Sequence, residues 1–536
     1  MTGTARDCED SSAESNRAGA LAEIVLVFLV FFIHGAWQVP EVNEPHYLGK
    51  AKHYWDATWA PRDFFLGTAD AHEAFYVAFG WLTLWLPLPA VAWCGRIITW
   101  ALMAIAWRRL SVALVPGALY SVLSAALFVA LISRFHMAGE WVIGGVEGKS
   151  FAYVFVLFGL ASLVRGGWGW ALVLFGAAAS FHVIVGGWAV VATCIAWLAA
   201  ANRPPASNLV LPALMGLVLS LGGLLPAIEL TWGADPELVD QANRIYVYER
   251  LGHHLLPARL PTSYVVRHLL LVGALVPLAW MAPDSESIRR LRGFVAACVG
   301  IAALGMAISL LAWWDADLAA RLLRYYWFRL SDAMVPLGAS LLACAILLRW
   351  QRERHPAFAV GLGATMLAAG LHLGDTMWQR RLYPVPPADW RVADLKDWRA
   401  VCRWASEETP PDALFLVPRM SQTFRWYSGR GEVVTRKDLP QDAASIVEWH
   451  RRLTDIYGPG DTRWPRRTLA DLGAARLEEL GRKYGADYVV TRPTPPLPLK
   501  RVGPLTRTLA VYALPRSPAS TSPHADEVTS EGHAAP

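Results

Sequence analysis

The sequence predicts a mainly α-helical membrane protein, a transmembrane bundle of about eleven helices followed by a small C-terminal α/β domain. Of its 536 residues, 54% are hydrophobic and only 17% are charged, and the mean hydropathy is +0.31. A water-soluble domain rarely sustains such a composition over this length. Apolar runs recur up to Leu373, and beyond it short apolar runs alternate with amphipathic segments. The chain therefore divides into a membrane part, residues 18–373, and an outer part, residues 374–514.

The predicted spans are mostly apolar runs near the roughly 17–25 residues that cross a bilayer as a helix, although several are shorter. Residues 1–17 are polar, and the first run is too long for a cleavable signal peptide, so we expect it to remain as an anchor. The runs are Ala18–Trp37, Pro87–Trp107, Ser111–Ser133, Phe151–Val164, Trp168–Phe181, Val183–Ala201, Asn208–Ile228, Arg267–Met281, Gly293–Trp313, Leu330–Arg349 and Ala357–Leu373.

The orientation follows from the basic residues in the short turns, which favour the cytoplasmic side. With a cytoplasmic N-terminus, every inside turn is short and basic, provided that Phe75–Leu86 lies on the outer surface as an interfacial helix. If that segment were a span, Arg108 and Arg109 would face outside. The inside residues are then Arg108, Arg109, Arg165, Arg203, Arg289, Arg290, Arg292, Arg349, Arg352 and Arg354. The C-terminal domain is accordingly expected outside the cell membrane.

The charge and the cysteine content argue against nucleic-acid binding and against cysteine-based disulfide or metal sites. The formal net charge of +5 comes mostly from the basic turns, so it indicates topology and not nucleic-acid binding. Four of the six cysteines lie in apolar spans, and Cys402 is the only one in the outer domain. We therefore expect neither a disulfide framework nor a cysteine-based metal site.

The outer part, residues 374–514, carries the alternation of strands and helices that is typical of an α/β domain. Predicted strands are Ala413–Pro418, Glu432–Thr435, Tyr488–Thr491 and Leu509–Leu514, and predicted helices are Ala443–Tyr457 and Leu477–Tyr484. Residues 515–536 are rich in Ser, Pro and Ala, and we expect a disordered tail.

The predicted outer loop, residues 38–86, holds the strongest functional signal. Glu41 and Glu44 follow the first span directly, between Pro40 and Pro45, which disfavour a regular helix. A partly desolvated carboxylate there is suited to act as a general base, so both glutamates are candidate catalytic residues. Candidate substrate-binding residues in the same loop are His46, Lys50, Lys52 and Asp56. The alternatives are a solvated polar loop and, for the lysines, contacts with lipid headgroups.

Three further clusters fall on the predicted outer side. Glu147 and Lys149 follow a glycine-rich stretch at a helix start, where the glycines allow close backbone approach to a ligand or to the first loop. The other candidate substrate-binding residues are His182, Arg250, His253, Arg324 and Arg329. The alternatives are a helix-start acid for Glu147, a structural histidine for His182, interfacial anchoring for the segment around Arg250, and an Arg329–Asp332 ion pair.

The chain resembles an uncharacterised bacterial polytopic membrane family over nearly its whole length. The motifs are Asn43-Glu44-Pro45-His46-Tyr47-Leu48, Lys52-His53-Tyr54-Trp55-Asp56, Phe151-Ala152-Tyr153 and Tyr326-Trp327-Phe328-Arg329. The layout also resembles the GT-C glycosyltransferases, which carry an acidic motif after the first span. In those enzymes that acid serves as base or helps to hold a metal. This chain has two glutamates three residues apart in place of a tight acidic pair.

The resemblance implies a membrane glycosyltransferase-like enzyme in the bacterial inner membrane. It would transfer a sugar from a polyprenyl-phosphate donor to an acceptor glycan, lipid or protein at the outer face. A divalent cation is one expectation for a cofactor, and the sequence identifies none. Two other functions stay open: a transporter or flippase of a lipid or anionic solute, and a non-catalytic scaffold for the outer domain.

The topology gives the first testable prediction. A reporter that functions only outside the cytoplasm should be active when it is fused after Leu373, because the basic turns place the C-terminal domain outside. A fusion at the same residue with a reporter that works only in the cytoplasm should be silent. Activity of the cytoplasmic reporter alone would refute this orientation.

Overall fold

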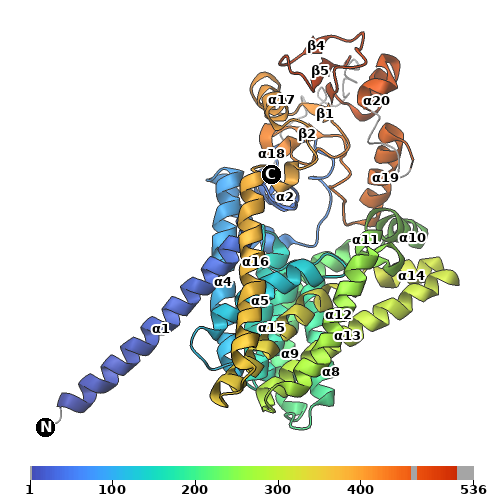
Figure 1. The fold of residues 1–536 in the computed structure, drawn as a ribbon. Helices are drawn as coiled ribbons and strands as arrows, with labels where there is room; N and C mark the ends of the chain where they lie inside the picture. The colour runs from blue at the N-terminus through green and yellow to red at the C-terminus, as the bar shows by residue number, and fades with distance from the viewer. Residues whose placement is uncertain (1–2, 460–467, 516–536) are drawn as a thin grey trace, which may run out of the picture.

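The computed structural model describes residues 3–459 and 468–515, with side chains from Arg17 onward. The chain forms a bundle of helices with a smaller α/β domain seated on one end, as Figure 1 shows. The segment that follows the first helix lies between these two parts and contacts both.

Seven helices are long and apolar enough to cross a membrane. They include α1 (Gly3–Gly35, apolar from Arg17), α4 (Leu88–Leu114), α9 (Ser207–Glu229), α12 (Thr262–Met281), α13 (Glu286–Leu310), α15 (Arg329–Arg352) and α16 (Phe358–Leu382). Four shorter apolar helices are α5 (Tyr120–Phe135), α6 (Gly148–Val164), α7 (Trp168–Phe181) and α8 (Val183–Ala199). The protein is therefore mainly helical, with apolar helices that could span a membrane.

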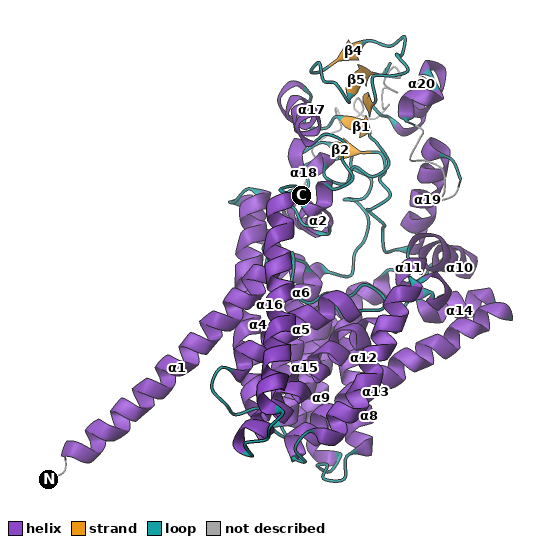
Figure 2. Cartoon of the chain, viewed as in Figure 1, coloured by secondary structure: helices purple, strands orange, loops and turns teal. Residues whose placement is uncertain are grey.

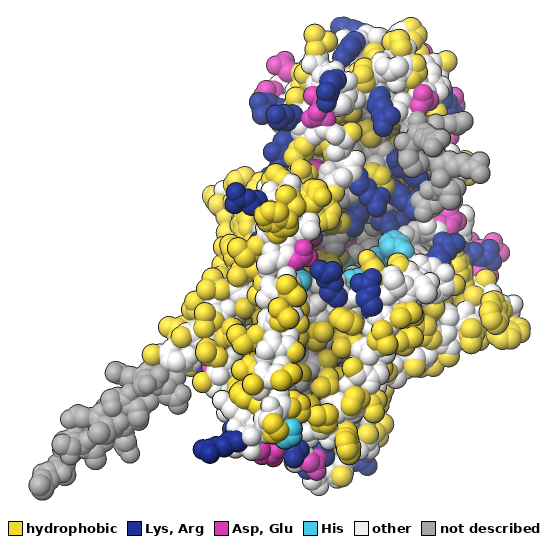
Figure 3. Space-filling view, viewed as in Figure 1, with side chains coloured by type: hydrophobic (Ala, Val, Ile, Leu, Met, Phe, Trp, Pro, Cys, Tyr) yellow, Lys and Arg dark blue, Asp and Glu magenta, His cyan; other side chains and the backbone are white. Residues whose placement is uncertain are grey.

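Helix α15 forms the centre of the bundle. Its sequence is apolar around nearly the whole circumference, and 94% of its most apolar window is buried, against 6% for α16. A helix that is apolar on all sides is expected in the interior. The flanks of the bundle expose mainly hydrophobic side chains, visible in Figure 3. This surface suits a lipid environment.

Several predicted boundaries were wrong. Residues Ser111–Leu114 continue α4, and the break before α5 falls at residues 115–119. Arg108 therefore lies within α4, where its guanidinium pairs with the Glu23 carboxylate at 2.9 Å. Helix α16 continues to Leu382, past the expected end at Leu373.

The basic turns share one end of the bundle, opposite the α/β domain (Figure 1). Arginine side chains from these turns donate to backbone carbonyls of neighbouring turns. The pairs are Arg165 with Arg109, Arg290 with Val164, Arg349 with Met281, and Arg352 with Pro116. The side of the membrane on which this end lies stays a prediction.

The segment after α1 folds into three short elements. They are α2 (Glu44–Trp55), α3 (Glu73–Ala78) and the 3-10 helix η1 (Gly80–Leu84). Phe75–Leu86 is thus too short as a helix to span the bilayer, and its alternative interpretation as a span was wrong. The expectation that Pro40 and Pro45 discourage a regular helix across them is confirmed. Residues 41–43 lie outside the helices, and Pro45 occupies the first turn of α2, where proline is tolerated.

The connection between α9 and α15 adds short helices near the α/β domain. They are α10 (Pro236–Arg244), the π-helix η2 (Ile245–Arg250), α11 (Gly252–Leu255), the 3-10 helix η3 (Pro257–Arg259), the 3-10 helix η4 (Leu311–Trp313) and α14 (Ala316–Leu323). Ala242 and Ile245 join the hydrophobic core of the α/β domain. This connection therefore ties the domain to the bundle.

The C-terminal domain contains a mixed five-stranded sheet in the order β2-β1-β3-β5-β4 (Figure 2). Strand β1 pairs in parallel with β2 and β3, and β5 is antiparallel to β3 and β4. The strands are β1 (Leu414–Leu416), β2 (Gly431–Glu432), β3 (Tyr488–Thr491), β4 (Arg501–Val502) and β5 (Ala510–Ala513). The helices are η5 (Pro387–Asp389), α17 (Leu395–Glu408), α18 (Phe424–Ser428), α19 (Ala443–Tyr457), η7 (Leu469–Leu472) and α20 (Ala474–Tyr484).

A fully buried arginine joins this domain to the segment after α1. The Arg425 guanidinium contacts Asp63 at 2.7 Å, Glu432 at 3.1 Å, and Asp438. Burial raises the pKa of Glu432 well above its usual range, and the nearby Arg425 guanidinium opposes that shift. Arg62 adds a second link, to Asp487 at 2.9 Å. Arg62 and Asp63 therefore face the C-terminal domain and do not pair with each other.

Replacing Arg425 should loosen the C-terminal domain. We expect Arg425→Met to lower the free energy of unfolding by about 3–5 kcal/mol, because it leaves buried carboxylates without their cation. Arg482→Met, at an exposed position of the same domain, should change it by less than about 0.5 kcal/mol. Thermal unfolding and limited proteolysis of the purified chain measure both; equal stability of the two variants would contradict the role of Arg425.

Candidate functional site

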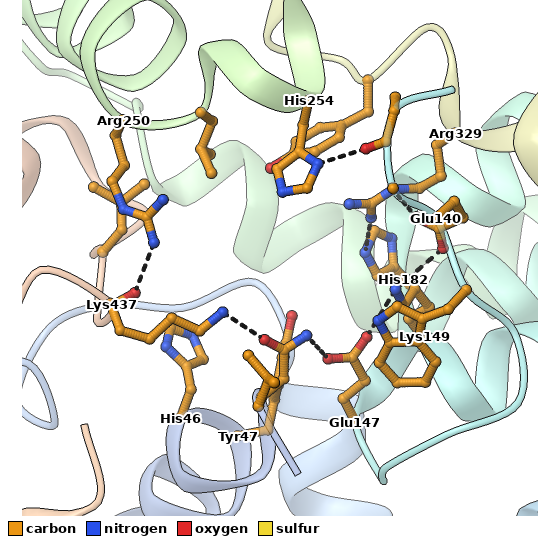
Figure 4. Close-up of a pocket in the computed structure, with 18 of the residues that line it drawn as sticks. His46, Tyr47, Glu140, Glu147, Lys149, His182, Arg250, His254, Arg329 and Lys437 are labelled. Atoms are coloured by element: carbon orange, nitrogen blue, oxygen red, sulfur yellow. Dashed lines mark hydrogen bonds and ion pairs between the residues drawn. The ribbon is translucent and has the colours of Figure 1, made fainter. Parts of the chain in front are cut away.

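A cavity of about 380 Å³ lies where the bundle, the segment after α1 and the C-terminal domain meet. Figure 3 shows Lys and Arg side chains gathered around the hollow between the two parts, and Figure 4 shows the side chains that line it. The charged and histidine side chains at its wall are Glu41, His46, Glu140, Glu147, Lys149, His182, Arg250, His254, Arg329 and Lys437. The remaining wall includes Asn43, Tyr47, Trp141, Tyr246, Tyr326 and Gln441.

Glu44 does not line the cavity, but it holds the segments that do. Its carboxylate is fully buried and accepts two hydrogen bonds from Arg96 of α4, at 2.6 and 2.8 Å. It also accepts the N–H of Val146 at 3.1 Å and the N–H of Glu41 at 2.7 Å. A Cβ at Gly145 would lie 2.8 Å from Cβ of Glu41. The predicted close approach of the glycine-rich stretch to the first loop is thus confirmed.

Glu41 has a different environment, although it stands only three residues away. Its carboxylate lines the cavity and makes no hydrogen bond or ion pair with any residue that the structure describes. Burial raises the pKa of Glu41 to about 7, and the negative charge of Glu44 adds to the shift. A carboxylate with this pKa can take up and release a proton near neutral pH.

A chain of charged groups runs along the wall formed by the glycine-rich stretch and the start of α15 (Figure 4). Arg329, the first residue of α15, pairs with Glu140 at 3.0 Å, and Glu140 pairs with Lys149 at 3.2 Å. Lys149 also pairs with Glu147 at 3.2 Å and lies over the Trp141 ring, 4.0 Å from its centroid. Both cations on this wall are therefore compensated by carboxylates.

Asn43 continues this chain to the C-terminal domain. Its Nδ2 donates to Glu147 at 2.8 Å, and its Oδ1 accepts a hydrogen bond from Lys437 at 2.8 Å. Lys437 precedes α19 by a few residues, so the C-terminal domain supplies part of the cavity wall.

The alternative Arg329–Asp332 pair was wrong. Arg329 donates instead to Nε2 of His182 at 2.7 Å, which makes that imidazole nitrogen an acceptor. The Asp332 carboxylate accepts the backbone N–H groups of Met137 and Ala138, both at 2.7 Å. Asp332 therefore holds the loop that carries Glu140.

His46 contacts the C-terminal domain through a carboxylate. Its Nδ1 donates to Oδ1 of Asp438 at 3.2 Å, and Asp438 in turn pairs with Arg425. Burial lowers the pKa of His46, so the ring is neutral near pH 7 and its Nε2 carries the lone pair. The Asp438 contact thereby fixes the tautomer of a ring at the cavity wall.

Five predicted binding residues lie outside this cavity. Lys50 donates to the carbonyl of Thr68 at 2.5 Å, Lys52 to the carbonyl of Thr83 at 3.4 Å, and Asp56 accepts the N–H of Thr58 at 3.1 Å. Arg324 donates to Oδ1 of Asn243 at 2.7 Å, and the His253 ring lies 4.1 Å from that of His254. The structure does bring together Glu41, His46, Glu147, Lys149, His182, Arg250 and Arg329.

The sequence missed several wall residues, chiefly Asn43, Glu140, Lys437 and Gln441. Glu140 had a signal, because it opens the same glycine-rich stretch as Glu147. Lys437 and Gln441 had none, since only the docking of the C-terminal domain brings them to the cavity.

The residues present do not fit a divalent cation. Among residues 3–459 and 468–515, no three His, Cys, Asp or Glu side chains converge as metal ligands. Glu140 and Glu147 already pair with Lys149, and Glu44 pairs with Arg96. A cation here would have to displace these partners, so no step is assigned to a metal.

The family described as Domain of unknown function (DUF6798) matches residues 396–456, a stretch that includes Lys437 and Gln441. No curated protein matches the chain.

The raised pKa of Glu41 predicts a pH-dependent gain in stability for Glu41→Gln. The pKa is about 7 in the folded protein against an ordinary value of 4.5 for a glutamate, so the folded state binds the extra proton between these values. Stability therefore falls as the pH rises from about 4.5 through 7. Gln avoids this cost. The melting temperature of Glu41→Gln minus that of wild type should therefore increase from pH 5 to pH 8.

Glu44→Gln is the matched control. It loses a buried ion pair and should lower the melting temperature at both pH values. If the difference between Glu41→Gln and wild type does not grow with pH, the assigned pKa of Glu41 is wrong.

Proposed function

We propose that this chain is a membrane glycosyltransferase-like enzyme of GT-C type, with all of its apolar helices, about eleven, crossing the bilayer. It transfers a sugar from a polyprenyl-phosphate donor to an acceptor glycan, lipid or protein at the outer face of the bacterial inner membrane. Its N-terminus is cytoplasmic, its C-terminal domain is extracytoplasmic, and nucleic acid plays no part. The observation that carries this proposal is the unpaired Glu41 carboxylate, with a pKa of about 7, in a cavity rich in cations.

In the proposed reaction, Glu41 removes the proton from an acceptor hydroxyl. The hydroxyl oxygen forms a bond to the anomeric carbon of the sugar, and the bond from that carbon to the phosphate oxygen breaks. The electron pair of the broken bond stays on the phosphate, and the proton stays on Glu41 until it is released to water. The base thus needs a pKa near the working pH, which burial supplies to Glu41.

The leaving polyprenyl phosphate gains negative charge in this step, so fixed positive charge around it lowers the barrier. Four Lys and Arg side chains line the cavity: Lys149, Arg250, Arg329 and Lys437. Of the arginines that the sequence suggested for this role, Arg324 lies outside the cavity and is not retained.

Glu44 is assigned a positioning role. Both of its oxygens accept hydrogen bonds from Arg96, and the ion pair is fully buried. Each oxygen accepts two hydrogen bonds, so neither is open to an acceptor hydroxyl, and the carboxylate fixes the backbone of Glu41. The choice between the two glutamates that the sequence left open is thereby made in favour of Glu41.

A transporter is the competing function. Transporters place their binding groups near the bilayer midplane, on broken helices. The present cavity lies at one end of the bundle, between it and the C-terminal domain, which favours surface chemistry over translocation.

Replacing the base separates these functions. We expect Glu41→Gln to lower turnover by roughly 10²–10⁴, as for the loss of a general base, while the protein stays folded. Sugar release from polyprenyl-phosphate sugars by purified protein measures this directly. In cells that lack the protein, Glu41→Gln should fail to restore the missing surface glycan.

Lys396→Met, at an exposed site of the C-terminal domain, is the control and should leave turnover unchanged. Wild-type turnover in folded Glu41→Gln would exclude this residue as the base. Normal glycans together with lost uptake of a solute would favour the transporter.

A further inference from the structure

Two cavity cations lack the carboxylate partners that the others have. Lys149 and Arg329 are paired with Glu140 and Glu147. Arg250 and Lys437 form no ion pair within the described part of the chain. A partly buried cation without a counter-charge is costly. Two such cations at one cavity therefore indicate a site for an anion.

Backbone contacts fix the direction of Arg250. Its Nε donates to the carbonyl of Arg436 at 3.0 Å, and its Nη2 donates to the carbonyl of Lys437 at 3.4 Å. These two contacts lie on one edge of the guanidinium. The terminal Nη1 has no hydrogen-bond partner among the residues described, and Arg250 lines the cavity.

Lys437 reaches the same cavity from the C-terminal domain. Its Nζ makes a single hydrogen bond, to the neutral Oδ1 of Asn43 at 2.8 Å. An ammonium group has three N–H donors, so two remain for a ligand. In Figure 4 both the Arg250 guanidinium and the Lys437 ammonium point toward the interior of the cavity.

The electrostatics agree with this geometry. Burial lowers the pKa of Lys437 to about 8, and the charge of Arg250 lowers it further. Burial also lowers the pKa of Arg250 to about 10, with a contribution from Arg436. Each shift reports a cation that burial deprives of water, and a bound anion would offset part of this loss.

We propose that Arg250 and Lys437 together form a phosphoryl-binding subsite, completed only when the C-terminal domain is docked on the bundle. A phosphoryl oxygen fits both the free Nη1 of the guanidinium and the ammonium donors. A lipid phosphate and a free phosphate share this chemistry. The assignment to the phosphate of a lipid-linked donor rests on the proposed function, whereas phosphoryl binding itself does not.

Docking and ligand binding are linked in this arrangement. Arg250 belongs to η2 of the membrane part, and Lys437 belongs to the loop between β2 and α19. A ligand that contacts both residues binds only the docked form, so it stabilises that form. Ligand should therefore protect the seam between the two parts against proteolysis.

The test measures affinity of the full-length purified chain for two probes, inorganic phosphate and farnesyl phosphate. We expect Lys437→Met and Arg250→Met each to weaken binding about tenfold or more, as for the loss of a hydrogen bond to a charged group. Lys437→Arg keeps the charge and should retain most of the affinity. Lys396→Met, the exposed control, should retain all of it.

Glu41→Gln separates this proposal from the proposed function, because it should lower turnover by roughly 10²–10⁴ and keep phosphoryl binding. If both probes lose affinity in the two Met variants, the subsite recognises the phosphoryl group from either source. If the wild-type chain binds only farnesyl phosphate, and the two Met variants bind it more weakly, the ligand is lipid-borne. If neither affinity changes by more than about twofold in Met variants with wild-type melting temperatures, the subsite is refuted. If Lys437→Met and Lys437→Arg both unfold, an unchanged affinity in folded Arg250→Met refutes it as well.

Discussion

The buried guanidinium of Arg425 is the contact on which the cavity depends. It joins Asp63, from the segment after the first helix, to Glu432 and Asp438 of the C-terminal domain. Because a buried carboxylate without a cation is costly, these parts hold together as one unit. Asp438 also orients His46, and the neighbouring Lys437 reaches Asn43. A single buried charge cluster thus positions side chains from two distant parts of the chain.

A second buried pair, Glu44 with Arg96, fixes the same segment to the bundle from the other side. Glu41 lies three residues before Glu44, and its backbone N–H donates to the Glu44 carboxylate. The anchors hold Glu41 at the wall without neutralising it, which is how a carboxylate in a cation-rich cavity keeps a pKa of about 7. The cost of this arrangement in stability is typical of functional sites.

Local pattern predicted much of the secondary structure. The helix at Ala443–Tyr457 and the strand at Tyr488–Thr491 have the predicted bounds. Both were predicted from local signals. The helix has a regular apolar period, and Gly485 ends the helix before the strand. The break between α4 and α5 was misplaced, because Arg108 looks like a turn residue but pairs with Glu23 inside the bundle. Periodicity cannot report such a tertiary partner.

The site was predictable only in part, for a related reason. Clusters of charge near the ends of apolar runs identified Glu41, Glu147, Lys149, Arg250 and Arg329, since such groups are costly near a membrane unless they have a function. The sequence could not separate Glu41 from Glu44, because their difference lies in Arg96. Lys437 and Asn43 are 394 residues apart in the sequence, and no local pattern predicts their contact.

The most direct test is an experimental structure of the full-length chain with a prenyl phosphate bound in detergent or nanodiscs. The account predicts density for the phosphoryl group between Arg250 and Lys437, with the Glu41 carboxylate facing the same cavity and the Arg425 cluster intact. Phosphoryl density at Arg324, or elsewhere outside the cavity, would contradict it. A C-terminal domain separated from α2 in the bound state would contradict it equally.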